Sequence, residues 1–362
     1  MGYGFVTISM LREIDKIISA SYAEEEYPVL CRQIESWSKT QPLKGLSVLD
    51  ATPIFGNTLM KYKALLLAGA DLSVGVTDKL PADAGIIEKL KIWGIPLVFP
   101  TEKERKFDII LDCAASFSNL NARLGYVELT RSGVETYLKK GSPVYVADSG
   151  RIKKIETCLG TGESYFRAMK QLGYNDWRSK NLVVFGSGKV GLGIIVHAHK
   201  LGAIVTVVTE LSSITPRIKE YTSEIIGLNE PSRITGAIQK AYAVVTATGV
   251  AGAMEKICSP EIFINSSAIL ANMGVEDEYG ALIPNERVLA NKFAVNFILE
   301  EPTLLKYIEA TMALHNEGAA YLVNHPESKG EIIPPTETEN EMLAISKQNG
   351  IIGDELFLIE DS

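Results

Sequence analysis

Three glycines with a short, fixed spacing, Gly186, Gly188 and Gly191, directly follow the apolar segment Leu182–Phe185. The apolar segment predicts a buried strand. The glycines permit a sharp turn, the close approach of a pyrophosphate, and tight packing of the helix that follows. Free N–H groups at the start of that helix would face the phosphates. The sequence therefore predicts a dinucleotide site, formed by Gly186, Ser187, Gly188, Lys189, Val190 and Gly191.

An acidic residue stands at the end of the next predicted strand, in the segment "AIVTVVTE". This residue is Glu210, about 20 positions after the last glycine. A carboxylate at this place accepts hydrogen bonds from the ribose hydroxyls and repels a 2′-phosphate. The pattern therefore favours NAD over NADP as the cofactor.

The elements that must position this site alternate between short apolar runs and helical segments. Strand-like runs occur within 42–52 and at 71–77, 95–100, 107–114 and 142–149, and again at 182–185, 203–210, 241–249, 268–274 and 292–298, while 302–323 predicts one long helix. This alternation is typical of an α/β fold with parallel sheets. We predict two Rossmann-like domains joined by helical hinges: a substrate-type domain at 1–158, completed by about 302–362, and an NAD-binding domain at 159–301.

Composition narrows the classes of function. Of the 362 residues, 46% are hydrophobic and 22% are charged, and the net charge of −8 comes without a basic run, which argues against nucleic acid or an anionic membrane as a partner. The four cysteines, Cys31, Cys113, Cys158 and Cys258, lack metal-binding or disulfide spacing. With neither a leader pattern nor an apolar run long enough to span a membrane, a cytoplasmic protein with no metal site is expected.

Several segments, taken in order, resemble the S-adenosylhomocysteine hydrolase family. They are "AEEEYPVLCRQIESWSKTQPLKG", "DSGRIKKIETCLGTGES", "GSGKVG", "VTE", "VVTATG", "NMG", and "VN" followed by "EPT". The resemblance covers most of the chain. It implies a two-domain α/β enzyme that holds NAD tightly, oxidises the ribose 3′-hydroxyl of its substrate, eliminates a thiol, adds water and reduces the product.

The resemblance also implies residues around the cofactor. Residues carried over onto the family's cofactor positions are Thr246, Ala247, Thr248 and Gly249, then Asn272 and Gly274, then Asn296, and finally Thr130, Arg131, Ser132 and Thr157. The family's substrate positions are mostly replaced, by residues that include Pro53, Phe55, Asn57, Leu129, Ile152, Val275 and Glu301. A substrate other than adenosylhomocysteine is therefore expected.

Hydride transfer to NAD needs a group that moves a proton and a polar grip on the substrate. The candidates for these roles are Asp112, Asp148, Lys153, Lys154, Glu156 and Glu301. Each has a plainer alternative: the lysines could be a solvated helical pair, Asp148 a helix cap, and Glu301 a capping acid ahead of a helix.

The leading hypothesis is an NAD-dependent, adenosylhomocysteinase-like enzyme that oxidises a hydroxyl- or amine-bearing carbon of a small polar substrate. One alternative is genuine adenosylhomocysteine hydrolysis with a rebuilt pocket, and another is a catalytically silent NAD-binding regulatory protein. The resemblance also implies a homo-oligomer, either a dimer or a tetramer, and the long apolar helix expected at 302–323 is a candidate for packing across its twofold axis.

Overall fold

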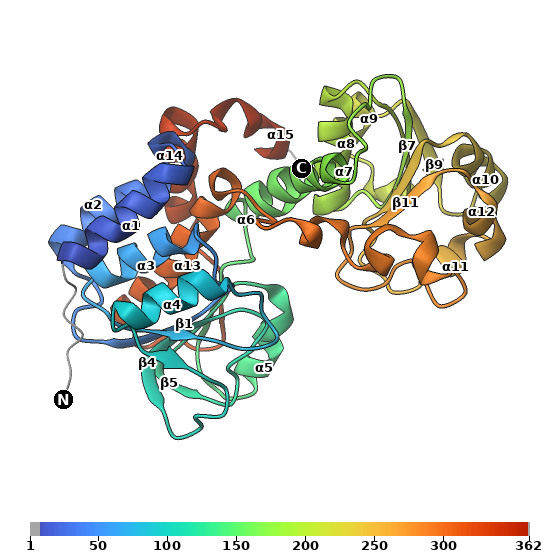
Figure 1. The fold of residues 1–362 in the computed structure, drawn as a ribbon. Coiled ribbons are helices and arrows are strands. Elements are labelled where there is room, and N and C mark those ends of the chain that lie inside the picture. Colours follow the sequence, from blue (N-terminus) through green and yellow to red (C-terminus); the bar gives the residue numbers. More distant parts are fainter. Residues whose placement is uncertain (1–7, 361–362) are drawn as a thin grey trace. The chain divides into compact units, whose positions relative to one another are not determined.

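The computed structural model describes residues 8–360, and the chain divides into two compact units. The first unit contains residues up to Lys153 together with Leu305–Asp354, and the second contains Lys154–Leu304 together with the segment from Glu355 onward. Each unit is an α/β structure around one parallel sheet (Figure 1). The predicted α/β fold with two Rossmann-like units is confirmed.

The sheet of the first unit has the strand order β12-β6-β5-β4-β1-β2-β3, with every neighbouring pair parallel. The strands are β1 (Ser47–Ala51), β2 (Asp71–Gly75), β3 (Leu97–Val98), β4 (Lys106–Asp112), β5 (Asn121–Glu128), β6 (Val144–Val146) and β12 (Glu331–Ile332). The helices are α1 (Ile8–Ser21), α2 (Pro28–Thr40), α3 (Thr58–Leu67), α4 (Ala84–Ile92), α5 (Val134–Leu138), α13 (Leu305–Asn324) and α14 (Thr336–Asn349). The strand order reverses between β1 and β4, where an open α/β sheet binds ligands.

The sheet of the second unit has the order β11-β10-β7-β8-β9, also parallel throughout. Its strands are β7 (Asn181–Phe185), β8 (Ile204–Thr209), β9 (Glu224–Gly227), β10 (Ala243–Thr246) and β11 (Ile269–Asn272). Its helices are α7 (Thr161–Gln171), α8 (Lys189–Lys200), α9 (Pro216–Tyr221), α10 (Pro231–Lys240), α11 (Ala253–Ile257), α12 (Pro260–Asn265) and α15 (Phe357–Glu360). The order reverses between β7 and β10, directly at the glycine segment.

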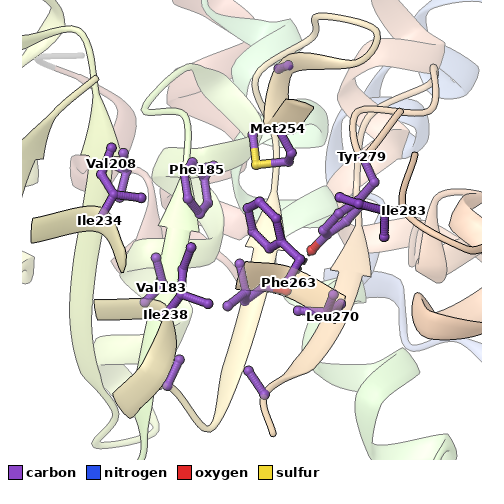
Figure 2. Close-up of a cluster of buried hydrophobic side chains, with 14 of the residues drawn as sticks. Val183, Phe185, Val208, Ile234, Ile238, Met254, Phe263, Leu270, Tyr279 and Ile283 are labelled. Atoms are coloured by element: carbon purple, nitrogen blue, oxygen red, sulfur yellow. Dashed lines mark hydrogen bonds between the residues drawn. The ribbon is translucent and has the colours of Figure 1, made fainter. Parts of the chain in front are cut away.

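One face of this sheet is covered by a dense apolar cluster. Figure 2 shows Phe263 of α12 between Phe185 of β7 and Tyr279, with aliphatic side chains of the strands and of α10 around them. The rings of Phe263 and Tyr279 meet edge to face at 5.7 Å. This buried face fixes the strands, and so fixes where their carboxyl ends present the loops of the site.

Two expectations need correction. Residues 292–298 do not form a strand. The 3-10 helix η6 (Leu289–Lys292) ends at Lys292, Ala294 makes a single parallel bridge to Asn272, and a second 3-10 helix, η7 (Val295–Ile298), follows; Ala290 and Asn291 turn the backbone into the left-handed region just before. The last residues of the chain group with the second unit, not the first. There Glu355 pairs with Lys200 at 3.3 Å, and Arg217 lies over the ring of Phe357.

Candidate functional site

The glycine loop after β7 makes a tight turn at the switch point of the second sheet. Gly186 has a φ of +98°, and a Cβ on it would lie 2.3 Å from the carbonyl oxygen of Ala247. A Cβ on Gly191 would lie 2.2 Å from the carbonyl oxygen of Gly186. Both glycines are therefore required by the packing of the loop itself, as the sequence predicted for a strand-turn-helix.

Gly188 differs from its two neighbours in the motif. Its backbone is ordinary, with a φ of −66°, and a Cβ built on it would meet no atom of the described residues within 4 Å. It is exposed and caps the N-terminus of α8, a helix of 12 residues. Among the described residues, packing therefore does not require a glycine at this position. A role for Gly188 in admitting a pyrophosphate at the N-terminus of α8 stays a prediction.

Hydroxyl groups connect the loop to the end of β8. The Ser187 hydroxyl lies 2.8 Å from that of Thr209 and 2.9 Å from that of Ser213, and Ser213 donates to the carbonyl oxygen of Glu210 at 2.7 Å. This network holds the backbone of Glu210 while its side chain is exposed. Glu210 thus follows β8 next to residues bonded to the glycine loop, the chain position at which the motif expects the ribose-binding acid.

The loops after β10 and β11 are held together by buried side chains. The Thr246 hydroxyl donates to Oδ1 of Asn272 at 3.0 Å, and Nδ2 of Asn272 donates to the carbonyl oxygens of Gly274, Glu276 and Lys292. All three predicted residues here are buried: Thr246, Asn272 and Asn296. Because the side chains of Thr246 and Asn272 bond to each other and to backbone, the arrangement favours a role for them in positioning these loops. Ala247 contributes the carbonyl against which Gly186 packs.

Glu278 is a residue of this site that the sequence did not reveal. Its fully buried carboxylate accepts hydrogen bonds from Thr248, through the backbone N–H and the hydroxyl, and from the N–H of Gly249 at 2.6 Å. It therefore ties the loop after β11 to the loop after β10. The signal in the sequence is weak, because "VEDE" reads as an ordinary solvated turn.

The predicted hinge residues Glu156 and Thr157 lie in η3 (Ile155–Gly160), a π-helical segment that begins directly after Lys154. The segment packs closely on α8, since a Cβ on Gly193 would lie 1.8 Å from the carbonyl oxygen of Cys158. His197 of α8 also bonds through Nε2 to the carbonyl of Leu159 at 3.0 Å. π-Helical turns are frequent at functional sites, and this one, which contains Glu156 and Thr157, packs through Cys158 and Leu159 on the helix that begins at the glycine loop.

Glu301 has its backbone fixed by Arg167 of α7, a second residue that the sequence did not single out. Nη1 of Arg167 donates to the carbonyl oxygen of Glu301 at 2.7 Å and Nη2 to that of Pro302 at 3.2 Å, while Nε bonds to Glu163. The Glu301 residue itself is half-buried.

Asp112 and Glu128 end neighbouring strands of the first unit and are fully buried. Asp112 accepts from the N–H groups of Cys113 and Phe117 and from the hydroxyls of Ser116 and Tyr137, and burial raises its pKa. This environment favours a structural role for Asp112.

Glu128 accepts from the N–H groups of Ala114 at 2.7 Å and Ala115 at 3.2 Å, two successive residues with positive φ, and from Thr130. Burial, reinforced by the charge of Asp112, raises the pKa of Glu128 to about 7. The two carboxylates together shape the turn that follows β4.

The structure also places the other residues of the first unit that were predicted to bind the cofactor or the substrate. Lys153 is buried and donates to the carbonyl oxygen of Leu129 at 3.1 Å, and Asp148 is half-buried just after β6. The Thr130 hydroxyl lies 2.9 Å from that of Ser132, and Arg131 pairs with Glu331 of β12. Their roles toward a cofactor or substrate stay predictions.

A buried charged pair in the same unit was also not predicted. Lys61 of α3 pairs with Asp50 of β1, and both side chains are almost wholly inaccessible. Burial lowers the pKa of Lys61 well below its ordinary value. The Thr52 hydroxyl donates to the same carboxylate at 2.6 Å. Both residues lie next to the strand switch point of this sheet, which the pair therefore braces.

Among residues 8–360, no group of three or more His, Cys, Asp or Glu side chains is placed to hold a metal ion. No helix in that part of the chain is long and apolar enough to cross a membrane.

Comparisons with known proteins bear on the fold. The chain is similar to the crystal structure of one of the subunits of dipicolinate synthase from Bacillus halodurans, at 14% identity and a TM-score of 0.51, over 77% of this chain and 98% of that one. A transhydrogenase from Sinorhizobium meliloti aligns at 13% identity and a TM-score of 0.45, over 78% and 96%; this second alignment is too weak to carry an argument. No protein-family model and no curated protein matches the chain.

At this level of identity the first similarity shows the fold alone. It agrees with the two parallel sheets described above and gives the class: an α/β chain of two Rossmann-like units. The resemblance to the S-adenosylhomocysteine hydrolase family stays a prediction.

Proposed function

We propose that this chain is an NAD-dependent oxidoreductase that oxidises a hydroxyl- or amine-bearing carbon of a small polar substrate other than adenosylhomocysteine. The observation that carries the proposal is Gly188. It follows the tight turn at Gly186 and stands at the N-terminus of α8, and the space around it is open, so a pyrophosphate could approach the backbone there.

The shape and polarity of the surrounding site fit a dinucleotide. The N-terminus of α8 supplies N–H groups and the positive end of a helix dipole for a pyrophosphate. Glu210 lies on the β8 side of the switch point and the loops of β10 and β11 lie on the other side, so the two halves of a dinucleotide would extend in opposite directions across the carboxyl ends of the strands. The exposed carboxylate of Glu210 favours NAD over NADP.

When bound, NAD supplies the acceptor for a hydride that leaves the substrate carbon. The proton of the hydroxyl or amine must then pass to a base of the protein. Within the second unit, Glu156 on the π-helical segment and the adjacent Lys154 are our candidates for this role.

The test begins with the freshly purified full chain. It is denatured, and mass spectrometry identifies the small molecules that are released; NAD or NADH at one per chain is the expected result. NAD binding by the stripped protein is then measured by calorimetry for the natural chain and for Gly188→Val. We expect the variant to fold normally and to bind NAD about 100-fold more weakly or worse, because its side chain occupies the place of the pyrophosphate.

The matched control is Gly236→Ala in α10. A Cβ on this glycine also meets no atom of the described residues within 4 Å, and the position is remote from the glycine loop in sequence. Its NAD affinity should equal that of the natural chain. Equal NAD binding by Gly188→Val and the natural chain, or no NAD binding by either, contradicts the proposal.

A further inference from the structure

Two large apolar side chains stand in solvent at the carboxyl end of the second sheet. Val275, in the loop after β11, is 91% exposed, and Phe293, just after η6, is 73% exposed. Exposed apolar residues scattered singly are ordinary, but neighbouring ones often mark a place where a ligand or partner binds.

Asn272 brings together the backbone segments that carry these two residues. Its single amide nitrogen donates to the carbonyl oxygens of Gly274 at 3.2 Å and Glu276 at 2.8 Å, which flank Val275, and to that of Lys292 at 2.7 Å, which precedes Phe293. Since all three carbonyl oxygens surround one atom, the backbone segments that carry Val275 and Phe293 are neighbours. Both residues therefore belong to backbone that one buried side chain holds together.

The support is held in an unfavourable backbone conformation. Ala290, Asn291 and Lys292 have φ values of +52°, +51° and +71° in succession, a region that side-chain-bearing residues seldom adopt. Lys292 is buried, donates to the carbonyl oxygen of Gly280 at 2.6 Å and pairs with Asp277 at 3.3 Å. Such local strain is typical of segments whose geometry serves a site, since it is kept only where the surroundings enforce it.

The location of the pair agrees with a ligand site. Both side chains follow the carboxyl ends of the strands on the β10–β11 side of the switch point, opposite to Glu210. The pyrophosphate position at α8 lies between these two sides, so the reactive half of the proposed dinucleotide extends toward the loops of β10 and β11. Glu278 ties the same two loops together.

We propose that Val275 and Phe293 contact the substrate and select one that carries an alkyl or aryl group next to the carbon that is oxidised. This inference rests on the proposed NAD-dependent oxidation and names the substrate class for it. Covering the two side chains with an apolar group removes their surface from water, which is favourable, whereas a sugar or polyol gains nothing from them.

Benzyl alcohol and glycerol serve as probes, because both carry an oxidisable hydroxyl and differ in what lies beside it. Their binding to the NAD-loaded full chain is titrated by saturation-transfer NMR. Benzyl alcohol should bind at least about 10-fold more tightly than glycerol. Val275→Thr, which keeps the shape of the side chain, and Phe293→Ser should each weaken benzyl alcohol binding about 3- to 10-fold and leave NAD affinity unchanged.

The matched control is Leu201→Thr, which removes a 44% exposed apolar side chain at the far end of α8 and should leave benzyl alcohol binding unaltered. If NAD binds but the two variants bind benzyl alcohol as the natural chain does, this inference is overturned while the proposed function stands. If NAD itself does not bind, the proposed function and this inference are both wrong. The solution mass of each variant is measured as well; a smaller assembly with unchanged benzyl alcohol binding would assign Val275 and Phe293 to a contact between copies instead and overturn the inference.

Discussion

The carboxylate of Glu278 accepts two hydrogen bonds from Thr248, one from its backbone N–H and one from its hydroxyl, each at 2.8 Å. Glu278 is fully buried, and a third bond reaches it from the N–H of Gly249. One acidic side chain therefore fixes the loop after β10, which carries several of the predicted cofactor residues. The shape of this part of the site depends on a residue that need not touch the cofactor.

Replacing this carboxylate should loosen the loop. We expect Glu278→Ala to lower the free energy of unfolding by about 2–4 kcal/mol, because three hydrogen bonds to a buried carboxylate are lost, and to weaken NAD binding about 10-fold. Chemical denaturation and calorimetry measure the two effects. Glu276→Gln, an exposed position in the same loop, is the control. Unchanged NAD affinity in a well-folded Glu278→Ala protein would show that the loop does not position the cofactor.

The choice between the two nicotinamide cofactors should depend on Glu210. Loss of its carboxylate removes charge-assisted hydrogen bonds to the ribose and the repulsion of a 2′-phosphate. Glu210→Ser should therefore bind NAD about 10-fold more weakly and NADP more tightly than the natural chain does. Parallel titrations with both cofactors measure this, and Glu220→Ser, an exposed position in α9, is the control. Identical preferences in the variant and the natural chain would remove Glu210 from the site.

The sequence predicted the parts of the fold that depend only on residues close together in the chain. An apolar run followed by glycines specifies a strand, a turn and a helix without reference to other residues, and the glycine loop and Glu210 lie where this pattern indicates. The prediction for residues 292–298 was wrong for a related reason. Their apolar side chains suggest a strand, but the segment follows left-handed backbone at Ala290 and Asn291 and is bonded at Lys292 by the distant Asn272, and the local pattern contains neither feature.

Features built from distant residues could not be predicted. Gln33 bonds to the carbonyl oxygen of Ala313, and Leu30 to Glu309, across about three-quarters of the chain. Asp112 illustrates a different limit. Its position at the end of a strand suggested chemistry, yet the same position also suits a carboxylate that holds the next turn, and only the four donors around it separate these roles.

The buried pair of Lys61 and Asp50 predicts a specific pattern of stability. Lys61→Met leaves the carboxylate of Asp50 buried without its cation and should lower the free energy of unfolding by about 3–5 kcal/mol. Adding Asp50→Asn should restore most of that loss, because the double variant buries no charge. Urea denaturation of both proteins measures the difference. A double variant no more stable than Lys61→Met would mean that the ion pair itself contributes the stability.

Glu309 of α13 predicts how stability depends on pH. Its fully buried carboxyl accepts a hydrogen bond at 2.9 Å from the N–H of Leu30, in the first turn of α2, and burial raises its pKa from 4.5 to about 8. A carboxyl with a raised pKa in the folded protein holds its proton more tightly than in the unfolded chain. Its contribution is therefore fully present below pH 4.5 and is lost as the pH rises through about 8.

Glu309→Gln keeps an acceptor for Leu30 but cannot ionise. We expect the free energy of unfolding of the natural chain to fall between pH 5 and pH 8 relative to that of the variant, at a slope of up to about 1.4 kcal/mol per pH unit for one proton. Denaturation followed by tryptophan fluorescence reports the change, since Trp37 lies on α2 itself. Glu317→Gln is an informative comparison, because burial also raises the pKa of Glu317 on the same helix, but its carboxylate bonds to the side chain of Gln33. Parallel pH profiles for the natural chain and Glu309→Gln would show that Glu309 does not titrate in this range, and the capping bond to α2 would then be made by a charged carboxylate.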